Sequence, residues 1–332
     1  MHPKLTKAWK ALPERFRREL HTKLLSQTGI YFLSRSRNSQ RYNRDPANFA
    51  GNIQQVKDTY IAEKRGSNEV NQNTERRFLD IIDNLVMKNG VTRSTFKGRS
   101  SQIVSSVLNK YTLDKREISV LDIPSSTGSA SLGIREEIEK RYAVGSYILA
   151  DLCFDIYYDK KRECVFDDEG NLLQVKFKRR FVTINRAHRC GLEHTRFVGI
   201  VLFPAQVWSW FLKKKYKFTG FDRYQHIRLT HPDVDTLLDD KYFELKKLDV
   251  FKPIEGKFDL IISFNLLMRR YFDDTLIKLG IQNLGRALNE GGLLVIGEDL
   301  GVTFSVFTSR GGQLMEIGRE TQRPDHWLLY QP

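Results

Sequence analysis

The chain has 332 residues, of which 40% are hydrophobic and 28% charged, a composition typical of a globular protein and contrary to global disorder. Its three cysteines, Cys153, Cys164 and Cys190, are an odd and sparse set, which argues against a disulfide framework, and the absence of a CxxC pair argues against a zinc site. We see neither an apolar signal-peptide region nor a run of about 18 apolar residues, so we expect a cytoplasmic protein.

Positive charge is concentrated in two segments of the chain. The formal net charge is +14; residues 1–117 hold 23 Lys and Arg against 11 Asp and Glu, and residues 160–228 hold 16 against 6. A field of this sign favours an anionic partner, either nucleic acid, an acidic protein or an anionic lipid surface. Solvated helix faces are the alternative explanation. The oligomeric state is not indicated by the sequence.

The first 115 residues have the pattern of a basic, helical N-terminal region. Apolar residues recur at helical spacing, and stretches rich in Ser, Asn and Gln separate them. The pattern predicts helices over 4–26, 53–64, 74–89 and 100–111, a loop over 34–52 and a connector over 66–73.

From residue 116 onward, strands alternate with helices. This alternation predicts an α/β fold of the Rossmann-like kind, with a parallel sheet covered by helices on both faces. Two further runs joined by Arg-Gly-Gly predict a closing antiparallel hairpin. The predicted strands are 118–123, 145–151, 243–249, 258–264 and 293–298, the helices 129–141 and 274–289, and the hairpin strands 303–309 and 313–319.

Residues 160–228 interrupt this alternation. A structureless loop of this length is improbable, so we expect an inserted subdomain, with a β-hairpin that turns at 167–171. Within it, His188, Cys190 and His194 match no standard zinc spacing, and we expect no metal there. The aromatic run 197–212 is followed by a lysine cluster. This combination is compatible with peripheral membrane contact, with single-stranded nucleic acid or with a buried helix that has a solvated end.

Polar residues stand where four of the predicted strands end. Asp122-Ile-Pro-Ser-Ser-Thr-Gly128 links the first strand to the first helix, and its small residues allow close approach of a nucleoside. Asp151 ends the second strand, where a carboxylate can accept hydrogen bonds from both ribose hydroxyls. Asp249 ends the third strand, where it can hold an adenine amino group or cap a turn. Asn265 follows the fourth.

The order of these motifs resembles that of the class I S-adenosylmethionine-dependent methyltransferases. The likeness covers roughly 115–330 without the insertion, and it includes Leu248-Asp249-Val250 and Gly291-Gly292. It implies S-adenosyl-L-methionine as cofactor and transfer of its methyl group. The cofactor-binding residues that we predict are Asp122, Pro124, Ser125, Ser126, Thr127, Gly128, Asp151, Asp249, Val250, Asn265 and Leu266.

Within that class, three stretches resemble the chemotaxis receptor methyltransferases. They are Ser125–Gly128, Ile148–Asp151 and Phe258–Phe272, and that family also has a basic helical N-terminal domain and an inserted β-subdomain. Two features depart from the family. Pro124 replaces the first loop glycine and removes a backbone donor, and Ser129-Ala-Ser-Leu replaces the residues that follow Gly128. We therefore predict the methyltransferase class and not the receptor-glutamate substrate.

Candidate catalytic residues follow the fourth and fifth strands. Arg269, with its neighbour Arg270, can clamp an anionic substrate, Tyr271 stands next to them, and Asp299 can act as a base. We expect an anionic acceptor, which is a small molecule, a glycolipid or a protein side chain. A nucleic-acid (RNA) methyltransferase is one alternative, although Ser263-Phe-Asn-Leu replaces the Pro-Pro motif of many amino-methylating enzymes. A catalytically degenerate binding module is the other, and Pro124 supports it.

Overall fold

The computed structural model describes residues 46–67, 69–87, 97–98, 100–177, 180–184, 209–238, 243–268, 272–298 and 303–320. The chain divides into two compact units. The insertion unit comprises residues 1–93 and 155–227, and the sheet unit comprises 94–154 and 228–332. The predicted helix over 4–26 and most of the loop over 34–52 lie outside the described residues.

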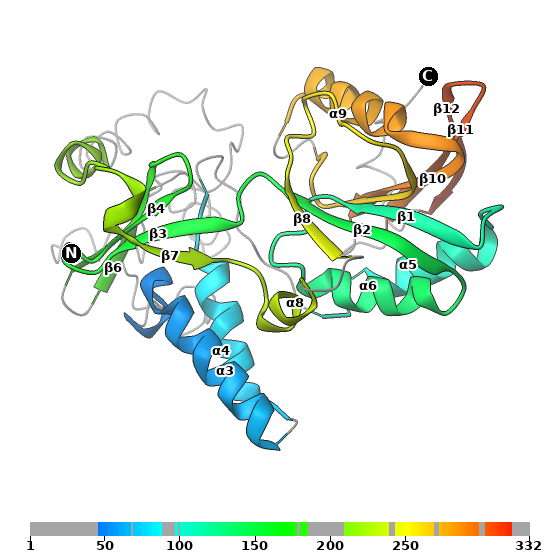
Figure 1. Ribbon diagram of the computed structural model, residues 1–332. Helices are drawn as coiled ribbons and strands as arrows, with labels where there is room; N and C mark the ends of the chain where they lie inside the picture. Colours follow the sequence, from blue (N-terminus) through cyan, green and yellow to red (C-terminus); the bar gives the residue numbers. More distant parts are fainter. Residues whose placement is uncertain are drawn as a thin grey trace, which may run out of the picture. The chain divides into compact units, whose positions relative to one another are not determined.

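The sheet unit is built on a seven-stranded mixed sheet in the order β8-β2-β1-β9-β10-β11-β12 (Figure 1). Strands β8, β2, β1, β9 and β10 run parallel, and β11 and β12 close the sheet as an antiparallel hairpin. This arrangement confirms the predicted Rossmann-like α/β fold. The strands are β1 (Glu117–Asp122), β2 (Ala143–Asp151), β8 (Phe243–Lys247), β9 (Phe258–Phe264), β10 (Leu288–Glu298), β11 (Thr303–Arg310) and β12 (Gln313–Glu320).

Strands β1 and β9 lie at the centre of this sheet, and most of their residues are buried. All seven residues of β9 are buried. Leu121 of β1 lies opposite Ile148 of β2 on one side and Ile261 of β9 on the other. Alternate residues point to opposite faces of a strand, so Leu260 packs in one core and Ile261 in the other. Two apolar faces require two layers of helices.

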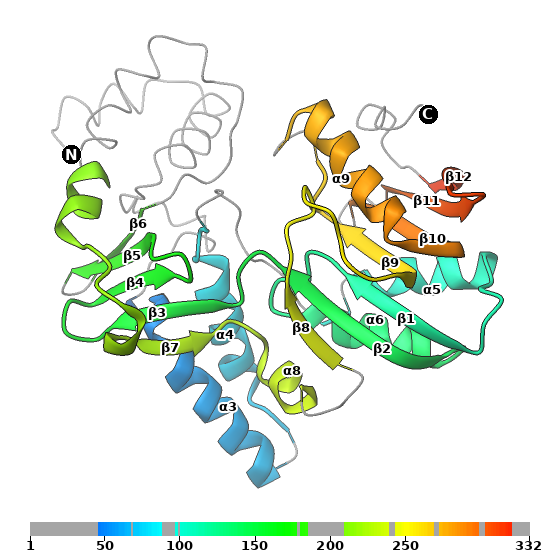
Figure 2. The same ribbon diagram turned by 45° about the horizontal axis from the view of Figure 1, so that its top comes forward.

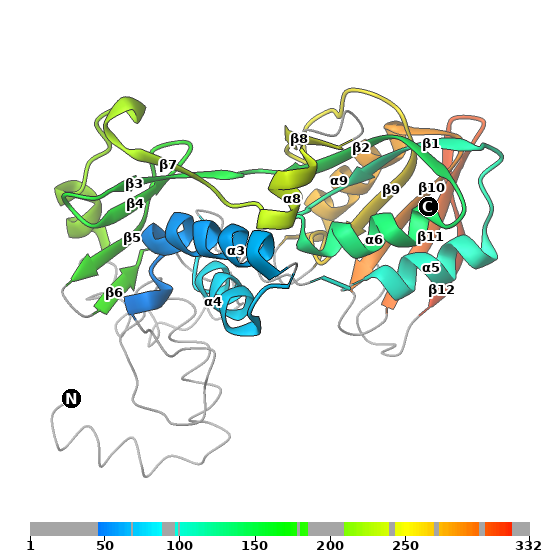
Figure 3. The ribbon, with the colours of Figure 1, turned by 60° about the horizontal axis from the view of Figure 1, so that its bottom comes forward.

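Those layers are present (Figure 3). The helices α5 (Ser101–Lys110), α6 (Ser129–Glu139) and α8 (Pro232–Leu237) contribute Val104, Ile134 and Val234 to the core on one face. The helix α9 (Asp274–Arg286) contributes Ile277 and Ile281 to the other core. Except for α8, each of these helices was predicted. The sheet is therefore covered on both faces, as a parallel sheet requires.

In its described residues, the insertion unit combines α3, α4 and a helical segment at 209–215 with a five-stranded antiparallel sheet in the order β6-β5-β4-β3-β7 (Figure 2). The predicted hairpin is confirmed, and the carboxylate of Asp167 fixes its turn by accepting from the amides of Glu169 and Asn171. The elements are three 3-10 turns, η2 (Pro46–Asn48), η3 (Ala50–Asn52) and η5 (Phe221–Arg223), the helices α3 (Ile53–Ser67) and α4 (Gln72–Asp83), and the strands β3 (Asp155–Asp159), β4 (Cys164–Asp167), β5 (Leu172–Phe177), β6 (Arg180–Thr183) and β7 (Gln225–Arg228).

The units do not follow the divisions that the sequence suggests at 115 and 160. Helices α3 and α4 belong with the inserted strands, whereas α5 belongs with the sheet unit. A buried glutamine of β5 explains part of this grouping. The side chain of Gln174 is fully buried; its Oε1 accepts from the amide of Ala50 at 3.0 Å, and its Nε2 donates to the carbonyl of Asn84 at 2.9 Å. One side chain thus joins the segments at both ends of the helical pair to the sheet.

None of the described helices is both long enough and apolar enough to cross a lipid bilayer.

Replacing Gln174 by alanine should destabilise the insertion unit by about 2–4 kcal/mol, because the amide of Ala50 and the carbonyl of Asn84 each lose their protein partner. Urea unfolding followed by circular dichroism measures the change. Gln55→Ala, on the exposed side of α3, is the matched control and should change stability by less than about 0.5 kcal/mol. Equal effects of the two substitutions would contradict the linking role of Gln174.

Candidate functional site

The candidate site lies where the connectivity of the parallel sheet reverses. From β1 the chain proceeds through β2 to β8 on one side, and it later returns to β9 on the other side of β1. In open α/β sheets, ligands bind at such a point, outside the carboxyl ends of the strands. Residues 123–128, between β1 and α6, form the loop at this edge. We call these six residues the β1 loop.

Hydrogen bonds to the end of β2 hold the backbone of the β1 loop. The amide of Ser125 donates to the carbonyl of Ala150 at 2.9 Å, and the amide of Ser126 donates to Oδ2 of Asp151 at 2.8 Å. The amide of Gly128 donates to the carbonyl of Ser125 at 2.8 Å. Pro124, which has no amide hydrogen, follows a cis peptide bond. The structure therefore brings the predicted loop residues together with Asp151.

Gly128 is required by backbone conformation and by space. Its φ is +75°, a region that residues with a Cβ rarely adopt, and it stands at the N-terminus of α6. A Cβ at this position would lie 2.9 Å from Cγ2 of Val234 and 3.0 Å from Cδ1 of Leu149. The absence of a side chain lets α6, α8 and β2 meet, so the conformation of the loop depends on this glycine.

Asp122 carries a buried carboxyl group that links β1, just before the loop, to α6 and β2. Its Oδ2 accepts from the hydroxyl of Ser131 on α6 at 2.5 Å and from the hydroxyl of Tyr147 on β2 at 3.4 Å. Burial raises the pKa of Asp122 from 3.8 to about 6; the two hydrogen bonds lower it, and the nearby Asp151 carboxylate raises it further. With 5% of its surface exposed, Asp122 is placed to connect β1, β2 and α6 rather than to present an open carboxylate.

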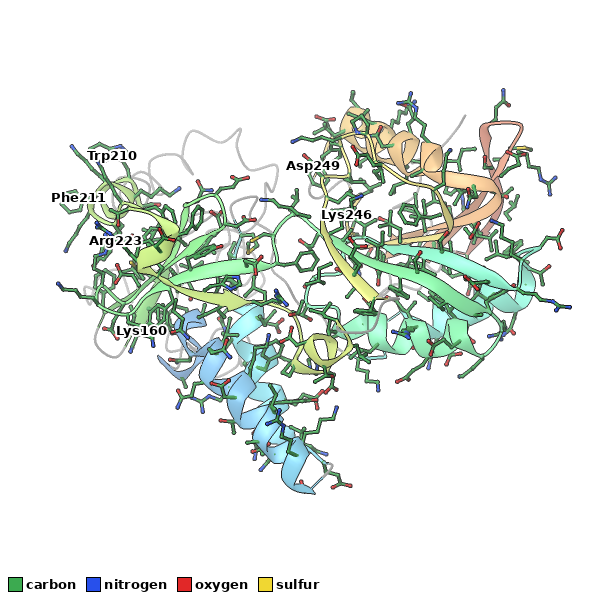
Figure 4. The ribbon with its side chains drawn as sticks, viewed as in Figure 1. Lys160, Trp210, Phe211, Arg223, Lys246 and Asp249 are labelled. Atoms are coloured by element: carbon green, nitrogen blue, oxygen red, sulfur yellow. The ribbon has the colours of Figure 1, made fainter. Side chains whose placement is uncertain are left out.

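Asp151 and Asp249 end neighbouring strands. The amide of Leu248 donates to the carbonyl of Asp151 at 2.9 Å and so extends the pairing of β8 with β2 to the strand ends. Oδ1 of Asp249 accepts from the amide of Phe251 at 3.0 Å, which is the turn-capping role that the sequence left open. Val250 is buried, and its carbonyl accepts from Nδ2 of Asn283 at 3.0 Å. Figure 4 labels Asp249 and the nearby Lys246 of β8.

Asn265 follows β9 in a left-handed backbone conformation, with φ at +60°. Its amide donates to the carbonyl of Gly297 at 2.7 Å, which ties it to β10. Asparagine tolerates this conformation better than most residues with a Cβ. Leu266, the next residue, is partly buried against the core beneath α9. Asp122, the β1 loop, Asp151, Asp249 and Asn265 therefore stand at the carboxyl ends of adjacent strands.

The sequence analysis missed the contribution of α8. The amide of His231 donates to the carbonyl of Thr127 at 2.8 Å, and Val234 packs against Gly128. A start signal for this helix was present, because Pro232 stands at its first turn together with Asp233. The predicted insertion ends at residue 228 and the third predicted strand begins at 243, and no helix is predicted between them.

Several predicted residues lie outside the described part of the chain. They are Arg269, Arg270, Tyr271 and Asp299, and in the insertion His188, Cys190 and His194. The roles predicted for Arg269, Arg270, Tyr271 and Asp299 in binding and activating the methyl acceptor therefore stay predictions.

Asp122 should make the stability of the sheet unit depend on pH. Because its folded pKa is above its unfolded value, its favourable contribution is complete below about pH 4 and is lost as the pH rises through about 6. The difference corresponds to about 3 kcal/mol, at about 1.4 kcal/mol per pKa unit. Asp122→Asn removes this titration, so the stability of the variant relative to wild type should increase by that amount between pH 4 and 7.

Urea unfolding at several pH values tests this expectation. Asp114→Asn, which changes an exposed carboxyl group of the same unit, is the matched control and should leave the pH profile unchanged. A constant offset between wild type and Asp122→Asn across pH 4–7 would contradict the raised pKa.

Comparisons with known proteins give a weak likeness of fold. No family model matches the chain, and no curated protein matches its sequence. Among solved structures, PKMT2 from Rickettsia typhi is 11% identical with a TM-score of 0.30, and the match covers 61% of this chain but 26% of that protein. An S-adenosylmethionine-dependent methyltransferase from Clostridium acetobutylicum is 12% identical with a TM-score of 0.28, covering 68% of this chain and 73% of that one.

A further structure is that of the N-methyltransferase NodS from Bradyrhizobium japonicum in complex with S-adenosyl-L-homocysteine. It is 12% identical with a TM-score of 0.28, and the match covers 66% of this chain and 71% of NodS. TM-scores this low support no conclusion about activity. The strand order and the site described above carry the functional interpretation instead.

Proposed function

We propose that this chain is an S-adenosylmethionine-dependent methyltransferase. The observation that carries the proposal is the β1 loop at the reversal point of the sheet, held by the same Asp151 that ends β2. A nucleoside binds at such a point with its ribose near the second strand and its base near the third and fourth. The chain has an acid after β2, an acid after β8 and an amide side chain after β9.

The residues present are chemically suited to this ligand. Oδ2 of Asp151 accepts from the amide of Ser126 and its Oδ1 accepts from the amide of Cys153 at 3.5 Å, yet a carboxylate has about four lone-pair sites. It can therefore hold the loop and accept from ribose hydroxyls at the same time. Asp249 likewise can cap its own turn through Oδ1 and accept from an adenine amino group. Asn265 can donate or accept through its side-chain amide.

When bound, the cofactor supplies an electrophilic methyl group on a sulfonium, so the protein needs chiefly to orient the reactants and exclude water. The chain's own contribution is a prearranged pocket edge. Hydrogen bonds to β2 hold the β1 loop, and the hydrogen bond from the backbone amide of Asn265 to the carbonyl of Gly297 holds Asn265. Asp122, which bonds to Ser131 and Tyr147, acts as a positioning residue beneath the loop.

The proposal extends to the chemical class of the methyl acceptor. We propose an anionic acceptor, which is a small molecule, a glycolipid or a protein side chain, because of the net charge of +14. Arg269 and Arg270 would clamp it and Asp299 would serve a hydroxyl acceptor as base, since a carboxylate acceptor needs none. The closer resemblance to the chemotaxis receptor methyltransferases, and the RNA methyltransferase alternative, stay predictions of the sequence.

One observation favours a second candidate, a methyltransferase-like fold used as a binding module. Four amides of the β1 loop, those of Ile123, Ser125, Ser126 and Gly128, already donate to protein acceptors, and Pro124 has no amide hydrogen to donate. Fewer loop amides are then available to an anionic group of a ligand. Such a module would bind S-adenosylmethionine weakly or not at all.

Isothermal titration with S-adenosylmethionine and S-adenosylhomocysteine separates the two candidates. We expect both ligands to bind the wild-type chain. Asp151→Asn should weaken binding by about 10–100-fold, because a charge-assisted acceptor of the ribose is lost while an oxygen that can hold the Ser126 amide remains.

Asp273→Asn is the matched control. Asp273 caps α9, a role that asparagine also fills, so its variant should bind as the wild type does. Folded wild-type protein that binds neither ligand would overturn the methyltransferase proposal and favour the binding module. If the wild-type protein binds both ligands, transfer of a labelled methyl group to one cell fraction would identify the acceptor.

A further inference from the structure

The insertion unit exposes large aromatic side chains beside a cluster of lysines. Trp210 is 60% exposed, Phe211 is 51% exposed and Phe221 is 46% exposed. Trp210 and Phe211 stand in the helical segment 209–215, and four exposed lysines, Lys213, Lys214, Lys215 and Lys217, follow them. We call the three aromatic residues, Trp210, Phe211 and Phe221, and these four lysines the aromatic–lysine patch. No acidic residue occurs between 209 and 221.

This segment is anchored to the sheet of the insertion unit by its inward side. Leu212 is buried in the core formed by β4 and β5, so the neighbouring Trp210 and Phe211 are turned outward. Nη1 of Arg162 donates to the carbonyl of Lys217 at 3.1 Å, and the amide of Thr219 donates to the hydroxyl of Tyr224 at 3.0 Å. The exposed aromatic side chains are therefore presented by a fixed scaffold.

Beyond the segment lie an exposed acid, Asp222, and further basic residues. Arg223 and Lys160 are also exposed, and Figure 4 places both on the same side of the unit as Trp210 and Phe211. The ring of Phe221 packs edge-on against Tyr157, with 4.6 Å between ring centroids. Exposed indole and phenyl rings surrounded by cations are the composition of surfaces that enter the headgroup region of an anionic bilayer.

Single-stranded nucleic acid fits this geometry less well. A base needs an open aromatic face on which to stack. Nζ of Lys214 lies 5.3 Å from the centroid of the Trp210 ring and covers one face of it. Phe221 is held edge-on by Tyr157 and by Phe218, whose ring centroid is 4.7 Å away. Insertion into a lipid interface requires no open face, because the ring enters as an apolar body with its edge near the headgroups.

We propose that the aromatic–lysine patch docks the insertion unit onto an anionic lipid surface. Trp210 and Phe211 enter the headgroup region, and the lysines lie against the negatively charged leaflet. This inference is independent of the proposed catalytic function, because the patch belongs to the insertion unit and the candidate cofactor site belongs to the sheet unit.

Co-sedimentation of the full chain with vesicles tests the proposal. We expect binding to phosphatidylcholine vesicles that contain about 30% phosphatidylserine and much weaker binding to phosphatidylcholine alone. Replacing Lys213, Lys214 and Lys215 together by glutamine should weaken binding about a hundredfold, since each lysine near an anionic leaflet contributes a factor of about five. Replacing Trp210 and Phe211 together by alanine should also weaken vesicle binding, because two apolar side chains that enter the headgroup region are lost.

Matched controls separate a specific surface from general positive charge. Arg65, Arg76 and Arg77 are exposed residues of α3 and α4 in the same unit, and their triple glutamine variant removes an equal charge. It should keep most of the binding. Leu279→Ala removes an exposed apolar side chain of the sheet unit and should have no effect.

Two results would overturn the proposal. One is equal loss of vesicle binding in the lysine variant and the arginine control, which would assign binding to net charge alone. The other is absence of binding to the vesicles that contain phosphatidylserine; salt-dependent binding of a single-stranded RNA oligonucleotide that the lysine variant loses would in that case make the patch a nucleic-acid surface.

Discussion

The hydrogen bond between the Ser126 amide and the Asp151 carboxylate is the contact on which the candidate site depends. Because β1 and β2 are parallel neighbours, their ends meet at one edge, and the loop that leaves β1 must cross the end of β2. Ser125 bonds to the carbonyl of Ala150, and Ser126 bonds to the side chain that follows it. An acid at the end of β2 thus shapes the loop before any ligand binds.

Asp122 extends this constraint into the core. Burial removes water from the Asp122 carboxyl group and so raises the free energy of its charged form. Hydrogen bonds from the hydroxyls of Ser131 and Tyr147 offset part of that cost. These two donors come from α6 and β2, so a single carboxyl group fixes the relative placement of three elements. An apolar residue would pack at this position without such directional bonds, and the start of α6 would be less firmly oriented toward the strand ends.

The strands of the sheet unit and its helices α5, α6 and α9 could be predicted from the sequence, because each has a local pattern of apolar residues. Four of the five parallel strands, β1, β2, β9 and β10, contain a short apolar run, and all seven residues of β9 are buried, as expected for a central strand. The grouping of α3 and α4 with the inserted strands was not predictable, since it depends on the contacts of Gln174 with residues about 90 and 124 positions away. The role of Val234 beside Gly128 depends on a similar contact, across the whole insertion.

These contacts determine how Pro124 affects ligand binding. In a loop whose amides face a ligand, a proline removes one donor and weakens binding. In this chain the amides of Ser125, Ser126 and Gly128 donate to protein acceptors, so the loop is held by β2 and by its own turn. The conformational entropy of the loop is then lost on folding rather than on binding. Because the loop is already ordered, binding costs less conformational entropy, and this offsets part of the binding free energy lost with the Pro124 donor. The balance between the lost hydrogen bond and the saved entropy decides whether the fold binds the cofactor tightly enough to act as an enzyme or acts as a binding module.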